Sequence, residues 1–464
     1  MKRGAQLVCL LLAAPLFAQN ESQLAADFRH EGESFQSSCL HPAFNFGYIG
    51  GCAQLLFTDH PLHIAAGSLA PGNGFGFGPA FVAHYTPNEN WRLSWNADAV
   101  ATPNGSWRAG AYMTAVLIRH SLITPGTLDA AKTHRPLTVN DMPVFHIYAE
   151  NTSLNTVTYF GLGQGTPNTA RSYFGIRETI TGANVVWPIW KTLNVSLFGE
   201  ANGRFVALRR NHGQTIPSIE QIYTDATAPG LTDQPAFAQF GEGIRLRPSF
   251  AKGYVRLNYS LAFQEWVAGN STYSFRRFTA DLSHQFPLYR RTRSLLPKEF
   301  NGPDSCSQDV NAPSCPPISR DLEGSFGLRF LYTGSYVPQG HAVPFYFDPT
   351  LGGSDINGTA LLPSYPDYRF RGPNLLLLRA SFEHSIYKWP VGVKFMVDEG
   401  RVALSRDDLG WNHLAHSYAA GITVHAGGLP VIDLLFAWGG HEGTHTIANV
   451  SSSLLGGTSR PSLY

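Results

Sequence analysis

Charged residues are scarce in this chain of 464 residues. Only 14% of them are Asp, Glu, Lys or Arg, against about 25% in an ordinary soluble protein. The 34 basic residues nearly balance the 33 acidic ones, whereas a nucleic-acid-binding protein usually carries a clear basic excess. The composition therefore argues against a nucleic-acid partner and against a surface that is exposed to water on all sides.

Long apolar runs are lacking beyond the N-terminus. After Ala18 no stretch reaches the roughly 18 apolar residues that a membrane-spanning helix needs. The first residues resemble a secretory signal, because Lys2 and Arg3 precede an apolar segment that ends near Phe17. We therefore expect a signal peptide over residues 1–18 and an exported chain without a helical anchor.

Cysteine is rare as well. Four of the five cysteines follow the signal, as two local pairs, Cys39 with Cys52 and Cys306 with Cys315. In an oxidising periplasm such pairs can form disulfides or remain free thiols. Neither pair has a Cys-x-x-Cys spacing or a His-rich neighbour, so disulfides or free thiols are favoured over a metal site. We expect no metal and no cofactor.

The sequence does contain regular alternation of apolar and polar residues. It runs through residues 91–99 and 255–264, and more briefly through 193–197 and 278–283. A period of two predicts strands with one apolar and one polar face. A soluble β-sandwich would show the same pattern. The signal peptide, the scarce charge and the aromatics near strand ends favour a membrane barrel, whose strands need about 9–11 residues with an apolar outer face.

Sixteen candidate strands can be placed, and bacterial barrels have an even number of strands. The fold class that we predict is all-β: a transmembrane antiparallel β-barrel of about 16 strands over residues 62–464, after a short periplasmic segment over 19–61. Long segments and tight turns separate the strands, which predicts long loops at one end of the barrel and short turns at the other. The strands are expected to begin near residues 76, 91, 105, 143, 155, 171, 191, 235, 254, 273, 323, 373, 391, 415, 430 and 442, and the long segments cover 121–141, 211–234, 288–322 and 336–372.

The last third of the chain carries a specific resemblance. Its motifs resemble, in their order, the signature of the BamA/TamA-like bacterial surface antigen family, which comprises sixteen-stranded outer-membrane barrels for protein assembly and two-partner secretion. The resemblance is strongest over residues 343–440. The motifs are Leu351-Gly352-Gly353, Arg369-Phe370-Arg371-Gly372, Phe382-Glu383 and the segment from Phe395 to Gly400.

In that family the Arg-Gly element lies at the tip of a long extracellular loop that folds back into the lumen. The resemblance implies that Arg371, followed by Gly372, is the loop arginine, that Asp398 is its partner, and that Glu383 is a second acceptor. Two departures matter. Pro373 stands where the family has an aromatic residue, and the segment before the barrel is too short for a POTRA domain, which receives client polypeptides in the family.

The function implied by the resemblance is help with the insertion or translocation of polypeptides at a Gram-negative outer membrane, through lateral opening of the seam between the first and last strands. The expected partners are outer-membrane lipid, client polypeptides and a separate periplasmic protein, and the chain is not expected to be an enzyme. Two alternatives stay open: a passive diffusion channel, and an outer-membrane hydrolase built on the same barrel.

Two further patterns invite other readings. His441-Glu442-Gly443-Thr444-His445 matches the His-Glu-x-x-His pattern of zinc peptidases, but that chemistry needs a helix to bring both histidines to one face. The glycines nearby favour a hairpin instead. The basic cluster at residues 290–293 is expected to lie at a strand end near lipid headgroups rather than to bind clients.

Overall fold

The computed structural model describes residues 62–450, except 89, 119–141, 191–192, 212–214, 295–318, 387–390, 427–428 and 441. The predicted signal peptide, the segment over 19–61 and all four cysteines of the predicted pairs lie outside the described residues, as does His441. Within the described part of the chain, no helix has the length and apolar character needed to cross a membrane.

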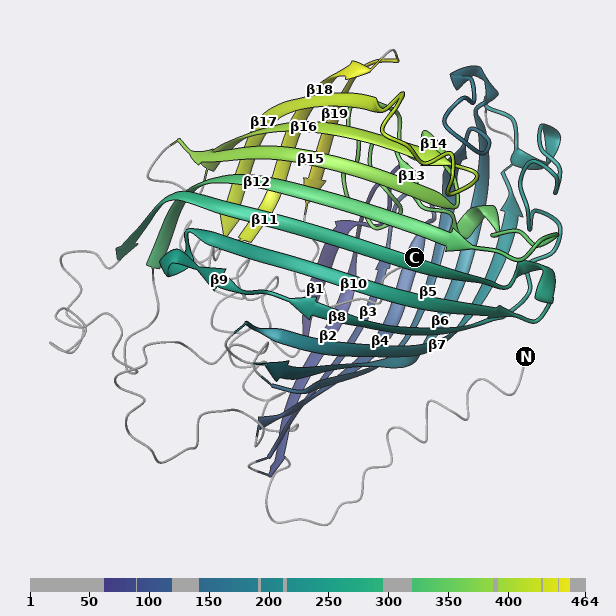
Figure 1. Ribbon diagram of the computed structural model, residues 1–464. Helices are drawn as coiled ribbons and strands as arrows, with labels where there is room; N and C mark the ends of the chain where they lie inside the picture. The colour runs from purple at the N-terminus through teal and green to yellow at the C-terminus, as the bar shows by residue number, and fades with distance from the viewer. Residues whose placement is uncertain are drawn as a thin grey trace, which may run out of the picture.

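A single antiparallel sheet dominates the structure (Figure 1). It contains 17 strands, one of which is the two-residue β9 (Ser249–Phe250), so that sixteen strands form the wall. Each wall strand pairs with the next along the chain. The wall strands are β1 (Leu62–Ser68), β2 (Phe75–Asn88), β3 (Trp91–Ala101), β4 (Trp107–Leu117), β5 (Val144–Tyr159), β6 (Ser172–Trp190), β7 (Val195–Arg210), β8 (Phe237–Leu246), β10 (Val255–Ala268), β11 (Phe275–Ser294), β12 (Ser319–Tyr336), β15 (Asn374–Ser385), β16 (Val391–Ala403), β17 (Ala415–Ala426), β18 (Leu429–Gly440) and β19 (Gly443–Val450).

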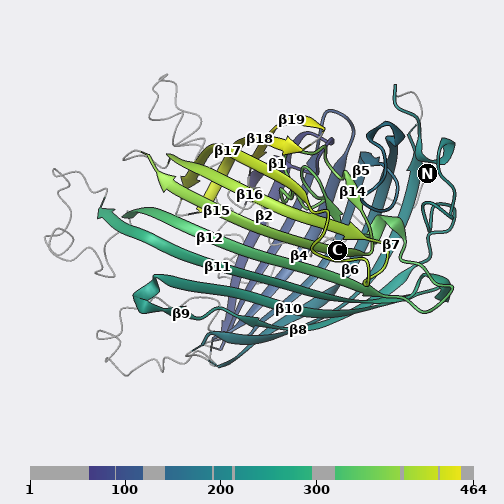
Figure 2. The same cartoon turned by 45° about the horizontal axis from the view of Figure 1, so that its top comes forward.

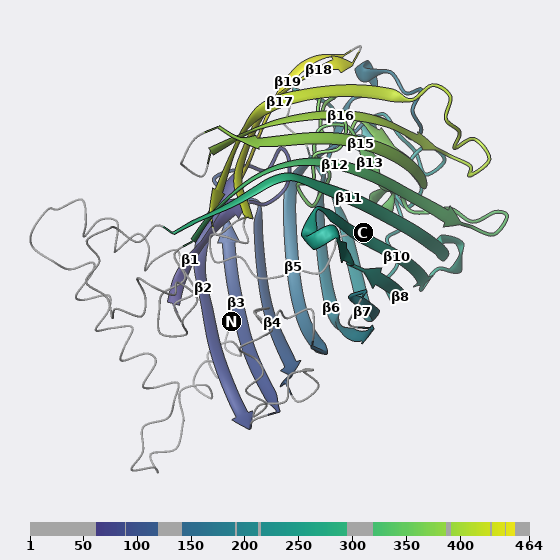
Figure 3. The same cartoon turned by 60° about the vertical axis from the view of Figure 1, so that its left-hand side comes forward.

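The sheet curls into a barrel, which brings its first and last strands together (Figures 2 and 3). β1 and β19 contact each other, and we call this junction the seam. The predicted fold class, an antiparallel transmembrane-type barrel of about sixteen strands, is confirmed.

Two expected strands differ from the structure although the count agrees. The strands expected near residues 143 and 155 are one strand, β5, whose register with β6 shifts between Leu154 and Val157. The shift interrupts the apolar–polar alternation of β5, so this part of the sequence resembles a turn between two strands. Conversely, β1 was missed because its core, Ile64-Ala65-Ala66, lacks alternation.

The long connections do not all lie at one end. Because the strands alternate in direction, the chain leaves β7 and β12 at one end of the barrel and β4 and β11 at the other. Two of the four long segments therefore join strands at each end, and the prediction that they share one end is wrong. We call the end where β12 finishes and β15 begins the plug end.

The two faces of the wall differ as predicted. Val397 on β16 is 39% exposed on the outside, whereas its neighbour Asp398 is fully buried on the inside. Large apolar side chains are exposed along the outer face, which is the pattern of strands that meet lipid. Examples are Trp95, Ile147, Phe240, Phe395, Leu434 and Phe436. The basic cluster at residues 290–293 lies among the last residues of strand β11, away from the plug end.

Candidate functional site: the plug loop in the barrel

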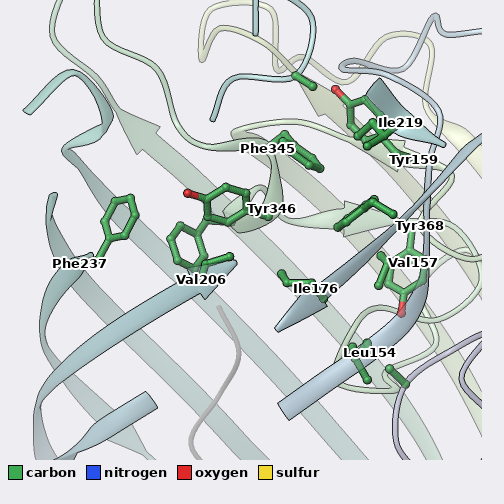
Figure 4. Packing of buried hydrophobic residues seen from close by; sticks show 14 of the residues in the cluster. Leu154, Val157, Tyr159, Ile176, Val206, Ile219, Phe237, Phe345, Tyr346 and Tyr368 are labelled. Atoms are coloured by element: carbon green, nitrogen blue, oxygen red, sulfur yellow. The ribbon is translucent and has the colours of Figure 1, made fainter. Parts of the chain in front are cut away.

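A loop of the plug end is buried inside the barrel, and we call its residues 337–373, between β12 and β15, the plug. It contains a short 3-10 helix, η8 (Phe345–Phe347), and the two-stranded ribbon of β13 (Thr350–Leu351) and β14 (Phe370–Arg371). The largest cluster of buried apolar residues joins the plug to the inner wall (Figure 4). The plug is thus a packed part of the interior.

Aromatic residues of η8 anchor the plug. The ring of Phe345 lies 4.9 Å from that of Tyr159 and 5.1 Å from that of Phe174, between centroids. On the other side, the Phe347 ring lies 5.0 Å from Phe237 and 4.5 Å from Trp266. Each such pair adds about 0.5–1.5 kcal/mol to the burial of its surface, so η8 is the firmest attachment of the plug to β5, β6, β8 and β10.

Arg371 helps to hold this anchor. It is buried, and its Nη1 donates a hydrogen bond to the carbonyl oxygen of Phe345 at 2.8 Å. Its guanidinium also lies 5.9 Å from the centroid of Tyr159, and its carbonyl oxygen accepts a 2.7 Å hydrogen bond from the backbone N–H of Gly163. Arg371 therefore joins β14 to η8 within the plug and joins the plug to the turn after β5.

The expected pair of Arg371 with Asp398 is not formed. Asp398 accepts hydrogen bonds from Nε and Nη2 of Arg379, at 2.7 and 2.6 Å, and from the backbone N–H of Leu362. Arg379 lies directly across the β15–β16 ladder from Asp398, so a wall arginine reaches the carboxylate first. The loop does meet Asp398, but through a backbone N–H instead of the Arg371 side chain.

Glu383 does not serve as the second acceptor. It lies near the opposite end of β15 from Arg371, where it accepts a hydrogen bond from the Thr423 hydroxyl at 2.9 Å. The register of β15 and β16 also keeps Glu383 away from Asp398, because Glu383 is opposite Lys394 whereas Asp398 is opposite Arg379.

The other motif residues bring the plug against β16. Gly400 faces inward, and a Cβ there would lie 3.0 Å from Cδ1 of Leu351, so the fully buried Leu351 packs directly on it. Gly352 has a φ of 105°, and a Cβ there would meet the Cβ of Arg369 at 2.5 Å. Phe395, by contrast, is 49% exposed on the outer face.

The close packing around Gly353 and Gly372 completes the base of the plug. Gly353 has a φ of 57°, and a Cβ there would lie 2.3 Å from Oδ1 of Asp367. The backbone N–H of Gly372 donates to the carbonyl oxygen of Pro349 at 3.3 Å. Gly352 and Gly353 need glycine for backbone reasons, because each has a positive φ and no room for a Cβ, so the motif specifies the fold of the plug as much as its contacts.

A different arginine makes the carboxylate clamp that the sequence had assigned to Arg371. Nε of Arg369 donates to both carboxylate oxygens of Glu442, at 2.8 and 2.7 Å. Its Nη1 and Nη2 donate to the hydroxyl and carbonyl oxygens of Thr166. The signal for Arg369 was visible, since it lies in the same Arg-Phe-Arg-Gly motif, but its partner comes from the turn between β18 and β19.

Glu442 and His445 of the zinc-peptidase pattern lie at and after the turn between β18 and β19. Glu442 is held by Arg369, and His445 lies within β19, not on a helix. Among the described residues, no group of three or more His, Cys, Asp or Glu side chains could hold a metal ion.

The inner wall is polar, as the alternation predicts, but sequence reasoning missed that its charged residues pair with one another. Buried ion pairs join Asp98 of β3 to Arg108 of β4, and Glu178 of β6 to Arg204 of β7, the second at 3.0 Å. A cavity of about 240 Å³ remains between the plug and the inner faces of β7, β8, β10, β11 and β12. The plug therefore leaves solvent-sized space on one side of the lumen.

Asp348, next to η8, faces this cavity. Burial raises the pKa of its carboxyl to about 8, although the nearby Arg277 and Arg371 guanidinium groups oppose the shift. The docked plug therefore holds a proton that an undocked plug, with an ordinary Asp pKa, would release. By linkage, docking is strongest below about pH 4 and weakens as the pH rises to about 8, where the carboxyl ionises even in the docked state.

We expect Asp348→Asn to remove this pH dependence, because the amide stays neutral. In the wild-type protein, protease cleavage within the plug should become faster between pH 7 and pH 9, after correction for the protease's own profile. In the variant the two rates should nearly agree. Asp355→Asn is the comparison in the same loop: burial raises the pKa of Asp355 only to about 6, so this variant should keep the wild-type change between pH 7 and pH 9. An equal pH dependence in wild type and Asp348→Asn would show that another group titrates.

Neither a protein-family model nor a curated protein matches the chain. Solved structures that resemble it include CdiB from Acinetobacter baumannii (12% identity, TM-score 0.43, 84% of this chain and 56% of that one). BamA from Haemophilus ducreyi lacking POTRA domains 1-3 is similar at 10% identity and a TM-score of 0.46, over 84% of this chain and 68% of that one. CdiB from Escherichia coli has 12% identity and a TM-score of 0.45, over 81% and 58%. The chain thus spans little more than half the length of the two CdiB proteins.

Proposed function

We propose that this chain is an outer-membrane barrel of the BamA/TamA-like surface antigen type, which assists the insertion or translocation of polypeptides. The observation that carries the proposal is the plug. A barrel of sixteen strands is wide enough to hold an aqueous channel, yet here a loop with the Arg-Phe-Arg-Gly motif packs across the lumen from Tyr159 to Asp398. A passive channel has no need of such a tightly held obstruction.

The seam supports the same proposal. β1 and β19 are the two ends of the sheet, and the barrel closes where they contact each other. A polypeptide could be passed to the membrane where these two ends part. The proposed mechanism is therefore lateral opening between β1 and β19, without chemistry on the client.

The proposed location is a Gram-negative outer membrane, with lipid around the apolar outer face. It draws on the signal-like start of the chain and on the alternation of the wall strands. We propose that a separate periplasmic protein delivers the clients.

The proposal can be tested with the purified full chain in lipid vesicles. An unfolded eight-stranded outer-membrane barrel is added as client, and its folding is followed by the change in its gel mobility before boiling. We expect folding several-fold faster than in vesicles without protein and in vesicles that contain a porin of similar size.

The alternatives give different results in the same preparation. Unchanged client folding together with a large steady conductance would mean a passive channel. Hydrolysis of lipid or ester substrates that a single Ser or His substitution abolishes would mean an enzyme. Either outcome contradicts the proposal.

A further inference from the structure

Consecutive residues of the plug contact the turns on both sides of the seam. Arg369 binds the carboxylate of Glu442, which lies in the turn leading into β19. Tyr368 donates its hydroxyl to the carbonyl oxygen of Pro71, in the turn leaving β1, at 3.4 Å. Both turns lie at the plug end, so one short piece of the loop bridges the first and last strands of the wall.

The attachment to the last hairpin is the stronger of the two. The Arg369 side chain is 3% exposed and that of Glu442 is 16% exposed, and a charged pair so screened from water is costly to break on one side only. The ring of Tyr365 also packs so closely on Gly440 that a Cβ there would lie 2.8 Å from it.

The attachment to the first strand depends on an unusual backbone. Tyr368 has a φ of 61°, a left-handed conformation that is uncommon for a residue other than glycine. Its side chain is 1% exposed. The conformation persists only because the surroundings hold it, and it turns Tyr368 and Arg369 toward different turns.

The tip of the last hairpin is built from glycine. Gly440 is opposite Gly443 in the β18–β19 ladder, where the register shifts, so the hairpin lacks side-chain pairs at its tip. A two-glycine tip adds no cross-strand packing. The side chain of Glu442 at this tip is held by Arg369 of the plug.

We propose that the plug acts as a staple across the seam: Arg369 and Tyr368 hold the last and first hairpins together, so that β1 and β19 separate only after the plug leaves these contacts. The coupling goes beyond the proposed function, since it would operate whether a polypeptide or a solute crosses the barrel. Glu442, the glutamate of the His-Glu-x-x-His pattern, acts in it as the anchor for Arg369.

Hydrogen–deuterium exchange of the full chain in lipid nanodiscs tests the coupling without any client. We expect Glu442→Gln to speed exchange about tenfold or more at the backbone amides of β19, β1 and plug residues 361–371 together, because the Arg369 charge loses its partner. Arg369→Gln should do the same. The matched control is Asp433→Asn, which breaks the 3.5 Å pair with Lys394 between β16 and β18 and leaves the plug untouched.

A reciprocal exchange of charges gives the sharper result. Arg369→Glu combined with Glu442→Arg should return exchange in all three segments toward wild type, whereas either change alone should not. Tyr368→Phe, which removes only the weaker hydroxyl contact, should speed exchange in β1 more than in β19. Faster exchange in β19 alone, with β1 and the plug at their wild-type rates, would overturn the proposal. Because no client takes part, this failure would leave the proposed function to its own test.

Discussion

Replacing Asp398 by alanine should lower the free energy of unfolding by about 3–5 kcal/mol, the usual cost of breaking a buried ion pair on one side. Asp398 is fully buried, and its loss strands the Arg379 guanidinium, which is only 13% exposed. It also removes the acceptor for the backbone N–H of Leu362 in the plug. The loss is measurable by urea titration in detergent or by the temperature at which the folded band disappears from a gel.

Double-mutant cycles separate this arrangement from the one that the sequence implied. Arg379→Ala and Asp398→Ala should be strongly non-additive, because each removes the same bidentate contact. Arg371→Ala and Asp398→Ala should add to within about 0.5 kcal/mol, since Arg371 bonds to the Phe345 carbonyl oxygen instead. A large coupling between Arg371 and Asp398 would contradict the structure.

A control uses a neighbouring pair. Lys394 on the same strand pairs with Asp433 at 3.5 Å, but both side chains are more than one fifth exposed. Lys394→Ala should therefore cost less than about 1 kcal/mol. A cost as large as that of Asp398→Ala would mean that burial does not explain the difference.

The fold could be predicted from the sequence because period-two alternation records which face of each strand meets lipid. The number of strands was right, but two errors cancelled: the bulge near Leu154 divided one strand, and the small, evenly apolar β1 went unseen. Alternation identifies strands that have two different faces. It is silent where a bulge breaks the pattern or where a strand consists of small, uniformly apolar residues.

The candidate site was located from the sequence but not paired correctly. The motif placed the loop in the lumen, and alternation placed Asp398 on the inner face, as the structure has it. Three arginines, at 369, 371 and 379, were chemically equivalent candidates for its partner. The choice follows from register: β15 and β16 form a hairpin in which Arg379 is opposite Asp398. Counting residues back from the connection between β15 and β16 would have identified Arg379 as the partner of Asp398. The Arg369–Glu442 pair depends on the path of the plug, so it could not be found by counting along the sequence.

Excising the plug should have the largest effect on the barrel as a channel. β12 and β15 pair directly, with Thr333 opposite Leu375, so a short Gly-Ser turn can replace residues 338–372 without altering the wall. We expect the single-channel conductance in planar bilayers to rise about tenfold or more, because a sixteen-stranded barrel without its loop leaves a water-filled lumen. The sheet from β1 to β19 should survive, since its neighbouring strands pair directly, whereas the seam loses its contacts with Tyr368 and Arg369.

The comparison with a milder change shows whether packing alone closes the lumen. Phe345→Leu keeps the loop and most of its buried surface while removing the ring contacts with Tyr159 and Phe174. It should lower heat resistance yet leave the conductance near wild type, apart from brief openings as the anchor loosens. Arg371→Ala should open more often than Phe345→Leu, because it leaves the Phe345 carbonyl oxygen buried without its donor. If excision left the conductance unchanged, the lumen would have to be closed by residues other than the plug, and the packing around η8 would then serve stability alone.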